Sequence, residues 1–116
     1  MRSKDNLVFV EDMISSIDKI LKYIETVNGL PDFLNNEMVI DAVTRNYEII
    51  GEAANKIPKE LKDKYEAVPW RQMYGLRNFA VHEYHIIDAT VLWAIAENNL
   101  IENKIQLELL LEKERK

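Results

Sequence analysis

The chain is poor in the residues that punctuate or cross-link a fold: it has no cysteine, three glycines and three prolines among 116 residues. Without cysteine there is no disulfide framework, no thiol nucleophile and no cysteine-based zinc site. Glycine and proline are too scarce for the many turns of a β-sandwich or barrel. Long helices need fewer such breaks, so the scarcity favours an all-α chain.

Positive charge and long apolar runs are also in short supply. Lysine and arginine number 15 against 20 aspartates and glutamates, which gives a formal net charge of −5. A protein that contacts many phosphates of a duplex is normally basic, so we expect no extended binding to duplex DNA. The most apolar stretch, residues 89–96, is far shorter than the ~20 residues of a membrane span. We therefore expect no membrane partner and a cytoplasmic location.

What is present is ordinary for a globular protein. Apolar residues make up 47% and charged residues 30% of the chain, a composition typical of a folded domain. The length fits a single domain over residues 1–116. No internal repeat, low-complexity stretch or linker divides it.

Apolar residues recur at the three- and four-residue spacing of one helix face in four stretches. The spacing predicts an all-α, up-and-down four-helix bundle with one short extra helical turn before the third helix, and a frayed, charged tail over residues 112–116. The first helix is expected from about Asp5 to Val27, and the second from a cap on Asn35 or Asn36 to the residue before Pro58. The third is expected from Pro69 to a point near His82 to His85, and the fourth begins at a cap on Asp88.

Candidate chemistry gathers at the expected end of the third helix, where Arg77, Asn78, His82, Tyr84 and His85 lie within nine positions. Arginine offers a permanent forked cation to phosphate oxygens, and histidine can move protons near neutral pH. This set suits phosphodiester chemistry, although such a cluster is more often a capping and hydrogen-bonding feature of a helix end. A carboxylate-bridged dimetal bundle is excluded, because no glutamate precedes either histidine by three residues.

Cleavage of RNA by its own 2′-hydroxyl needs a base, an acid and a cation, but no external nucleophile and no metal. One motif supplies His82 as a single proton shuttle, with His85 a weaker second candidate. A two-fold dimer would bring two motifs together and supply two of each group.

The stretch Gly75-Leu76-Arg77-Asn78, with His82 and Tyr84 behind it, resembles the Arg-x4-His-x-Tyr motif of HepT-like toxins in the HEPN superfamily. Residues 45–54 resemble the second-helix signature of the same family, and residues 69–71 resemble its entry into the third helix. The family often places Phe-Gly after the tyrosine, where this chain has His85-Ile86.

The resemblance implies a homodimeric helical bundle that acts as the metal-independent endoribonuclease toxin of a type VII HepT/MntA toxin–antitoxin system, without a cofactor. Arg77 and His82 would be catalytic, Asn78 would support them, and Tyr84 would accept AMP from the antitoxin, a minimal nucleotidyltransferase that thereby inhibits the toxin. Two alternatives stay open: a non-catalytic helical subunit that partners the nucleotidyltransferase, and an accessory subunit that binds a nucleotide or substrate.

A polar stripe and two tryptophans each allow either a functional or a structural interpretation. A polar stripe of Asp41, Arg45, Glu48 and Glu52 either supports the active-site helix or the antitoxin interface, or is a solvated ion-pair face. Trp70 either stacks on a base or an interface or belongs to the core, whereas Trp93 is expected in the core. Glycine inside the second helix, at position 51, indicates close helix packing.

Overall fold

The structure, a computed structural model, describes residues 3–81 and 89–116. Throughout these residues the regular elements are helices, which confirms the all-α prediction. Their bounds are α1 Ser3–Glu25, α2 Gly29–Leu34, α3 Glu37–Lys56, α4 Lys59–Lys64, α5 Trp70–Gly75, α6 Asn78–Val81, α7 Ala89–Asn98 and α8 Leu100–Glu114.

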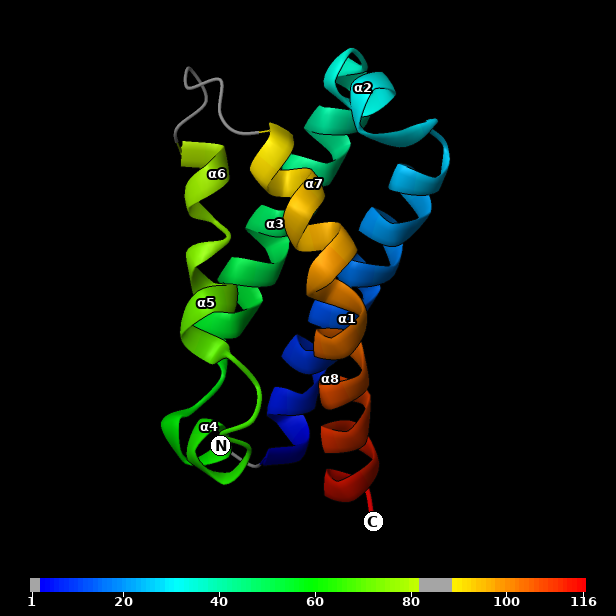
Figure 1. Ribbon diagram of the computed structural model, residues 1–116. Helices are drawn as coiled ribbons and strands as arrows, with labels where there is room; N and C mark the ends of the chain where they lie inside the picture. Colours follow the sequence, from blue (N-terminus) through cyan, green and yellow to red (C-terminus); the bar gives the residue numbers. More distant parts are fainter. Residues whose placement is uncertain (1–2, 82–88) are drawn as a thin grey trace.

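The bundle is built around the pair α1 and α3. Helices α5 and α6 follow one another along α3, and α8 lies along α1 (Figure 1). Helix α7 leads into α8 and packs against the short α2 at the opposite end from the chain termini. The result is an elongated molecule of 44 × 25 × 20 Å. No helix in the described ranges is both long enough and apolar enough to cross a bilayer.

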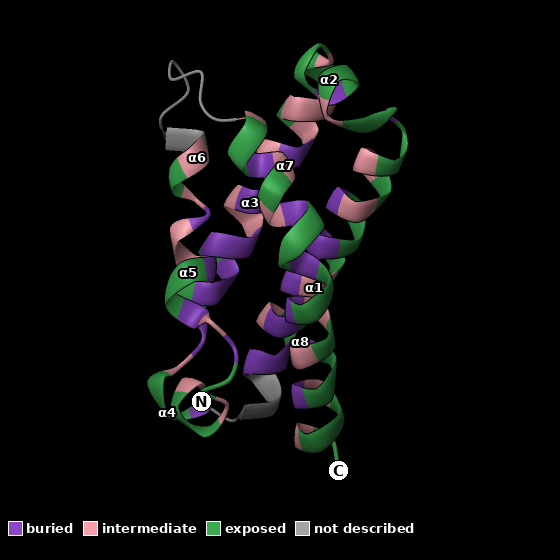
Figure 2. Ribbon diagram, in the orientation of Figure 1, coloured by how far each residue is buried: buried purple, intermediate pink, exposed green. Residues whose placement is uncertain are grey.

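The core lies where the apolar spacing predicts it, on the inward faces of the long helices (Figure 2). Full burial of one valine, leucine, isoleucine or methionine side chain contributes about 1.5–3 kcal/mol to the free energy of folding. The fully buried residues include Val10, Met13, Ile17 and Ile20 on α1, Val43, Tyr47, Ile50 and Ala54 on α3, and Leu100, Leu107 and Leu110 on α8.

Several predicted boundaries are confirmed. The side-chain oxygen of Asn36 accepts a hydrogen bond from the Val39 amide at 3.1 Å, so Asn36 is the cap of α3. The extra helical turn before the third helix is α4. The short helix α2 was not expected; Gly29, at φ +82°, turns the chain directly into it. Its buried Phe33 packs against Trp93 with ring centres 5.2 Å apart, so Trp93 belongs to the packing of this end of the core.

Two predicted helices are each divided in two. The third, expected to run unbroken from Pro69, is interrupted between α5 and α6, where the amides of Leu76 and Arg77 bond to carbonyls three residues back (3.2 and 3.4 Å). Such bonds tighten the chain and turn its axis. The fourth is interrupted at Asn99, which separates α7 from α8. Its predicted cap, Asp88, lies outside the described residues.

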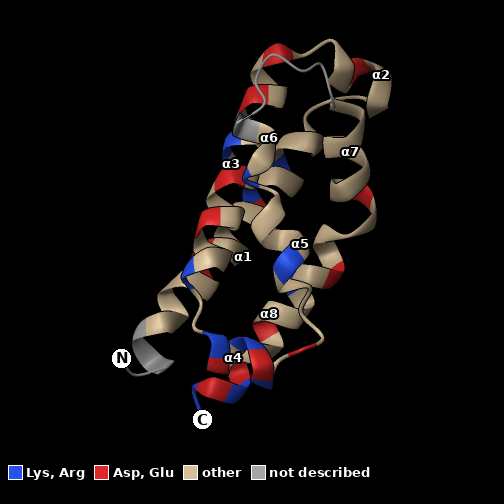
Figure 3. Cartoon of the chain, turned by 90° about the vertical axis from the view of Figure 1, so that its left-hand side faces the viewer, with Lys and Arg blue, Asp and Glu red and all other residues tan. Residues whose placement is uncertain are grey.

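The charged C-terminal tail is not frayed. Helix α8 continues to Glu114. Its carboxylate forms an ion pair with Lys64 at 2.8 Å and accepts a hydrogen bond from the Tyr65 hydroxyl at 2.5 Å. These contacts lower the pKa of Glu114 below its ordinary value. Charged residues of α4 and of the end of α8 lie together at one end of the molecule (Figure 3). The contacts of Glu114 with Lys64 and Tyr65 hold the tail there.

Gly51 is the point at which the α5–α6 junction approaches α3 most closely. A Cβ atom at this position would lie 2.7 Å from the Tyr74 carbonyl oxygen and 2.7 Å from the Arg77 amide nitrogen. Both are backbone atoms, so they cannot swing aside as a flexible side chain would. The expectation of close helix packing at Gly51 is confirmed.

The variant Gly51→Ala should therefore lose stability, although alanine is the better helix former by about 1 kcal/mol. Overpacking against backbone costs about 1–3 kcal/mol, so after the gain in helix propensity we expect a net loss of up to about 2 kcal/mol in the free energy of unfolding, measured by urea denaturation. Gly75→Ala is the matched control, because no atom lies within 4 Å of its added Cβ. Equal stability of the two variants would contradict the close approach.

Candidate functional site

The residues of the predicted motif fall into two groups. Arg77 lies between α5 and α6, and Asn78 is the first residue of α6. His82, Tyr84 and His85 lie outside the described residues. The convergence of Arg77 with His82 therefore stays a prediction from the sequence.

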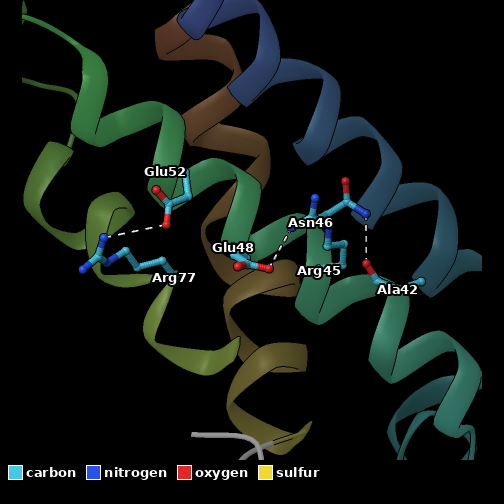
Figure 4. Close-up of polar contacts among 6 residues, drawn as sticks. All are labelled: Ala42, Arg45, Asn46, Glu48, Glu52 and Arg77. Atoms are coloured by element: carbon cyan, nitrogen blue, oxygen red, sulfur yellow. Dashed lines mark hydrogen bonds and ion pairs between the residues drawn. The ribbon is translucent and has the colours of Figure 1, made fainter. Parts of the chain in front are cut away.

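Arg77 is held on two sides, by Glu52 of α3 (Figure 4) and by the ring of Tyr74. Its Nη1 atom is 3.7 Å from Oε1 of Glu52 on α3, and its guanidinium lies 4.8 Å from the centre of the Tyr74 ring. The arginine side chain is 36% exposed and that of Glu52 50% exposed. The guanidinium is thus oriented by a carboxylate and an aromatic face while part of its fork of N–H groups stays open to solvent, as a phosphate ligand requires.

The backbone explains why Arg77 and Glu52 meet. Because Gly51 has no side chain, the amide of Arg77 lies directly against α3. Glu52, the next residue, then projects beside the guanidinium that leaves the junction. The contact joins residues 25 positions apart (77 minus 52) on different helices. The helical spacing of the sequence predicted that Glu52 lies in a polar stripe, but it could not predict that Arg77 is its partner.

The polar stripe on α3 does not act as one unit. Arg45 pairs with Glu48 at 2.9 Å, within α3 and near the surface. An exposed pair of this kind contributes only a few tenths of a kcal/mol. The solvated ion-pair interpretation therefore holds for Arg45 and Glu48, whereas Glu52 contacts Arg77 of the predicted motif.

Tyr47 connects α3 to the helices on both sides of residues 82–88. Its hydroxyl donates a 2.8 Å hydrogen bond to the Leu92 carbonyl on α7, and its ring lies 5.9 Å from that of Phe79 on α6. The side chain is fully buried, and burial raises its pKa, so the hydroxyl stays protonated and remains a donor. Tyr47 was expected only as an apolar position, because a hydrogen bond over 45 residues leaves no local pattern.

Asn46 belongs to the same segment of α3 but points away from Arg77 (Figure 4). Its Nδ2 atom donates to the Ala42 carbonyl at 2.9 Å. Its Oδ1 atom is buried and has no partner among the residues that the structure describes. An unsatisfied buried acceptor costs about 1–3 kcal/mol. Among the described residues Asn46 therefore bonds to Ala42 of its own helix and takes no part in the contact between Arg77 and Glu52.

Trp70 is a core residue. It is 8% exposed, and its indole Nε1 atom donates a hydrogen bond to the Tyr65 carbonyl at 3.0 Å. A ring that is buried and already hydrogen-bonded cannot stack on an incoming base. Of the two interpretations of Trp70, the structural one is therefore correct. Asn78, by contrast, is exposed beside Arg77.

Within the described residues, no three aspartate or glutamate side chains lie close enough together to hold a metal ion. Both histidines lie outside these residues. The described part of the site is thus a cation with its carboxylate, an aromatic ring and a neighbouring amide side chain.

Comparison with known proteins identifies the family to which the chain is similar. The sequence model of a family described as "Ribonuclease HepT-like" matches residues 13–110. A protein of Methanocaldococcus jannaschii named "Putative RNase MJ1380" is 34% identical over 110 residues, which cover 95% of this chain and 100% of the relative. A protein of Thermococcus cleftensis named "Probable ribonuclease HepT" is 32% identical over 102 residues, covering 88% of this chain and 92% of the relative.

No solved structure matched the chain. The family match spans most of the sequence, includes α3 and the α5–α6 junction, and agrees with the all-α bundle. On this evidence the chain belongs to the HepT-like ribonuclease family.

Proposed function

We propose that this protein is a metal-independent endoribonuclease and the toxin of a type VII HepT/MntA toxin–antitoxin system. The observation that carries the proposal is the partly exposed guanidinium of Arg77, oriented by Glu52 and Tyr74, in a chain of this family. The names of the relatives support the same chemistry.

In the proposed reaction the 2′-hydroxyl of a ribose attacks the adjacent phosphorus, and the bond from phosphorus to the 5′-oxygen breaks. The proton leaves the 2′-hydroxyl and another reaches the departing 5′-oxygen, so the products are a 2′,3′-cyclic phosphate and a 5′-hydroxyl. His82 transfers protons, Arg77 stabilises the charge that develops on the phosphate oxygens, and Asn78 orients the histidine or a substrate oxygen.

Glu52 has a distinct part in this proposal. At 3.7 Å its contact with Arg77 is longer than a tight ion pair, and both side chains are partly solvated. A phosphate can therefore replace the carboxylate at little cost, while Glu52 keeps the empty guanidinium in place between turnovers. Glu52 is a positioning residue, because it would act through Arg77 and not on the RNA.

The purified, unmodified protein should cleave RNA in the presence of EDTA and leave 2′,3′-cyclic phosphate ends. His82→Ala and Arg77→Ala should each lower the rate by about 100-fold or more, the contribution typical of a proton-transfer or charge-stabilising group. Arg71→Ala is the matched control, because Arg71 is an exposed arginine of α5 whose loss removes the same charge. It should change the rate by less than about threefold.

Activity that requires an added metal, or that survives His82→Ala, would contradict the mechanism. Binding to a nucleotidyltransferase without any cleavage by folded wild-type protein would instead favour the non-catalytic alternative. Arg77→Ala should fold normally, because the ion pair that it removes is half exposed and contributes under about 1 kcal/mol.

We further propose a homodimer in which two motifs face one another across a two-fold axis, because one chain contributes a single motif histidine. Sedimentation across a concentration series should give the mass of a dimer. Mixing Arg77→Ala with His82→Ala protein should restore part of the activity if the site combines groups from both chains. A monomeric mass at every concentration would remove the paired site.

The proposed partner is a minimal nucleotidyltransferase that transfers AMP from ATP to the hydroxyl of Tyr84 and releases pyrophosphate. The added phosphate carries negative charge and bulk next to the groups that would bind an RNA phosphate, so modification should inhibit cleavage. Intact-mass analysis after incubation with the transferase and ATP should show added AMP on wild-type and Tyr74→Phe protein, but not on Tyr84→Phe. Equal gain of mass by Tyr84→Phe would assign the modification elsewhere.

A further inference from the structure

Helices α7 and α8 present one continuous outer face in spite of the interruption at Asn99. The buried positions recur every three or four residues across the interruption, so the buried face of α7 is in line with the buried face of α8. The exposed faces of the two helices are aligned in the same way. The inward residues are Leu92, Ala96, Leu100, Asn103, Leu107 and Leu110. The opposite, exposed row is Val91, Ala94, Asn98, Ile101, Ile105 and Leu109, called here the outer seam.

The outer seam is more apolar than a solvated face requires. Val91 is 44% exposed, Ile101 59%, and Ile105 and Leu109 each 51%. Single exposed apolar residues are ordinary, whereas a continuous row of them marks an interaction site. The row spans about 27 Å at 1.5 Å per residue. Its alternating three- and four-residue spacing is that of a surface that packs against another helix.

Charge along the outer seam indicates the kind of helix. Four glutamates border it, and none of them has an ion-pair partner among the described residues. They are Glu97, Glu102, Glu108 and Glu112. The cations of α8 nearest to α1 are already engaged there, since Lys104 pairs with Asp18 at 2.7 Å and Arg115 pairs with Glu11. Lys104 acts on Glu108 only as a weaker, longer-range attraction, and Lys113 follows near the end of the seam.

We propose that the outer seam binds an amphipathic helix of a partner protein, whose apolar row is flanked by lysine and arginine. A basic flank would neutralise the four bordering carboxylates as its apolar row covers the seam. A second copy of this chain would instead bring acidic borders against acidic borders. An anionic membrane surface would be repelled in the same way.

The outer seam lies on other helices than those that flank Arg77. Helix α8 rests on α1, whereas α5 and α6, which flank Arg77, rest on α3 (Figure 1). A partner helix on the seam would therefore leave Arg77 uncovered. The inference stands or falls independently of RNA cleavage.

The test uses two synthetic helices of about three heptads with the same leucine row, one with lysine and one with glutamate at the flanking positions. Binding to the full chain is measured by fluorescence anisotropy at low salt. We expect the lysine-flanked helix to bind at least about tenfold more tightly, and added salt to reduce the difference. Equal binding of the two helices, or no binding of either, would overturn the proposal.

Variants locate the binding on the seam. Ile105→Glu should weaken binding of the lysine-flanked helix by about tenfold. Met38→Glu, at an apolar residue of α3 that is 82% exposed, should leave it unchanged. Made together, the charge reversals Glu102→Lys and Glu108→Lys leave the apolar row intact and balance the two remaining glutamates, so they should remove the preference between the two helices. If Ile105→Glu converts a dimer of this protein to a monomer, the occupant is a second copy and the proposal is wrong.

Discussion

The geometry of the candidate site depends on one backbone contact, the approach of the α5–α6 junction to α3 at Gly51. Helices usually pack through side chains, at 8–10 Å between axes. Here the Arg77 amide and the Tyr74 carbonyl lie where a Cβ of residue 51 would be. That contact fixes the origin of the Arg77 side chain relative to α3. It also explains why Glu52, the next residue, is the carboxylate that meets the guanidinium.

Tyr47 provides a second fixed point, one helical turn earlier on α3. The Gly51 contact holds the chain before residues 82–88, and Tyr47 holds α6 by its ring and α7 by its hydroxyl. The helices that precede and follow residues 82–88 therefore both pack against α3. A site built on a helix is positioned more accurately than one supported only by its own loop. The interruption of the third helix is part of this arrangement, since a junction can lie against α3 where a straight helix could not.

The sequence predicted the all-α class, the four long helical stretches, a cap at Asn35 or Asn36, close packing at Gly51 and the family, because these depend on local spacing or on residue types with few conformational options. It did not predict the interruption at Leu76 or at Asn99, since neither carries a proline and helical periodicity continues through both. The partners of Glu52, Tyr47 and Glu114 were also beyond local reasoning. Each contact joins residues that are 25 to 50 positions apart, as tertiary packing alone decides. The relation of Arg77 to His82 stays a prediction.

An acidic protein that acts on RNA needs its charges separated in space. A net charge of −5 repels a polyanion at long range. In the proposed reaction, cleavage of one phosphodiester nevertheless needs only a local cation, which Arg77 would supply at the α5–α6 junction. The unpaired glutamates of the outer seam lie on α7 and α8, so their repulsion acts on a different face of the bundle. If a basic helix covers that seam, the complex also becomes less negative overall, and RNA should approach Arg77 faster at low salt than it approaches the free protein. The two faces would then be linked by long-range electrostatics, with no change in the fold.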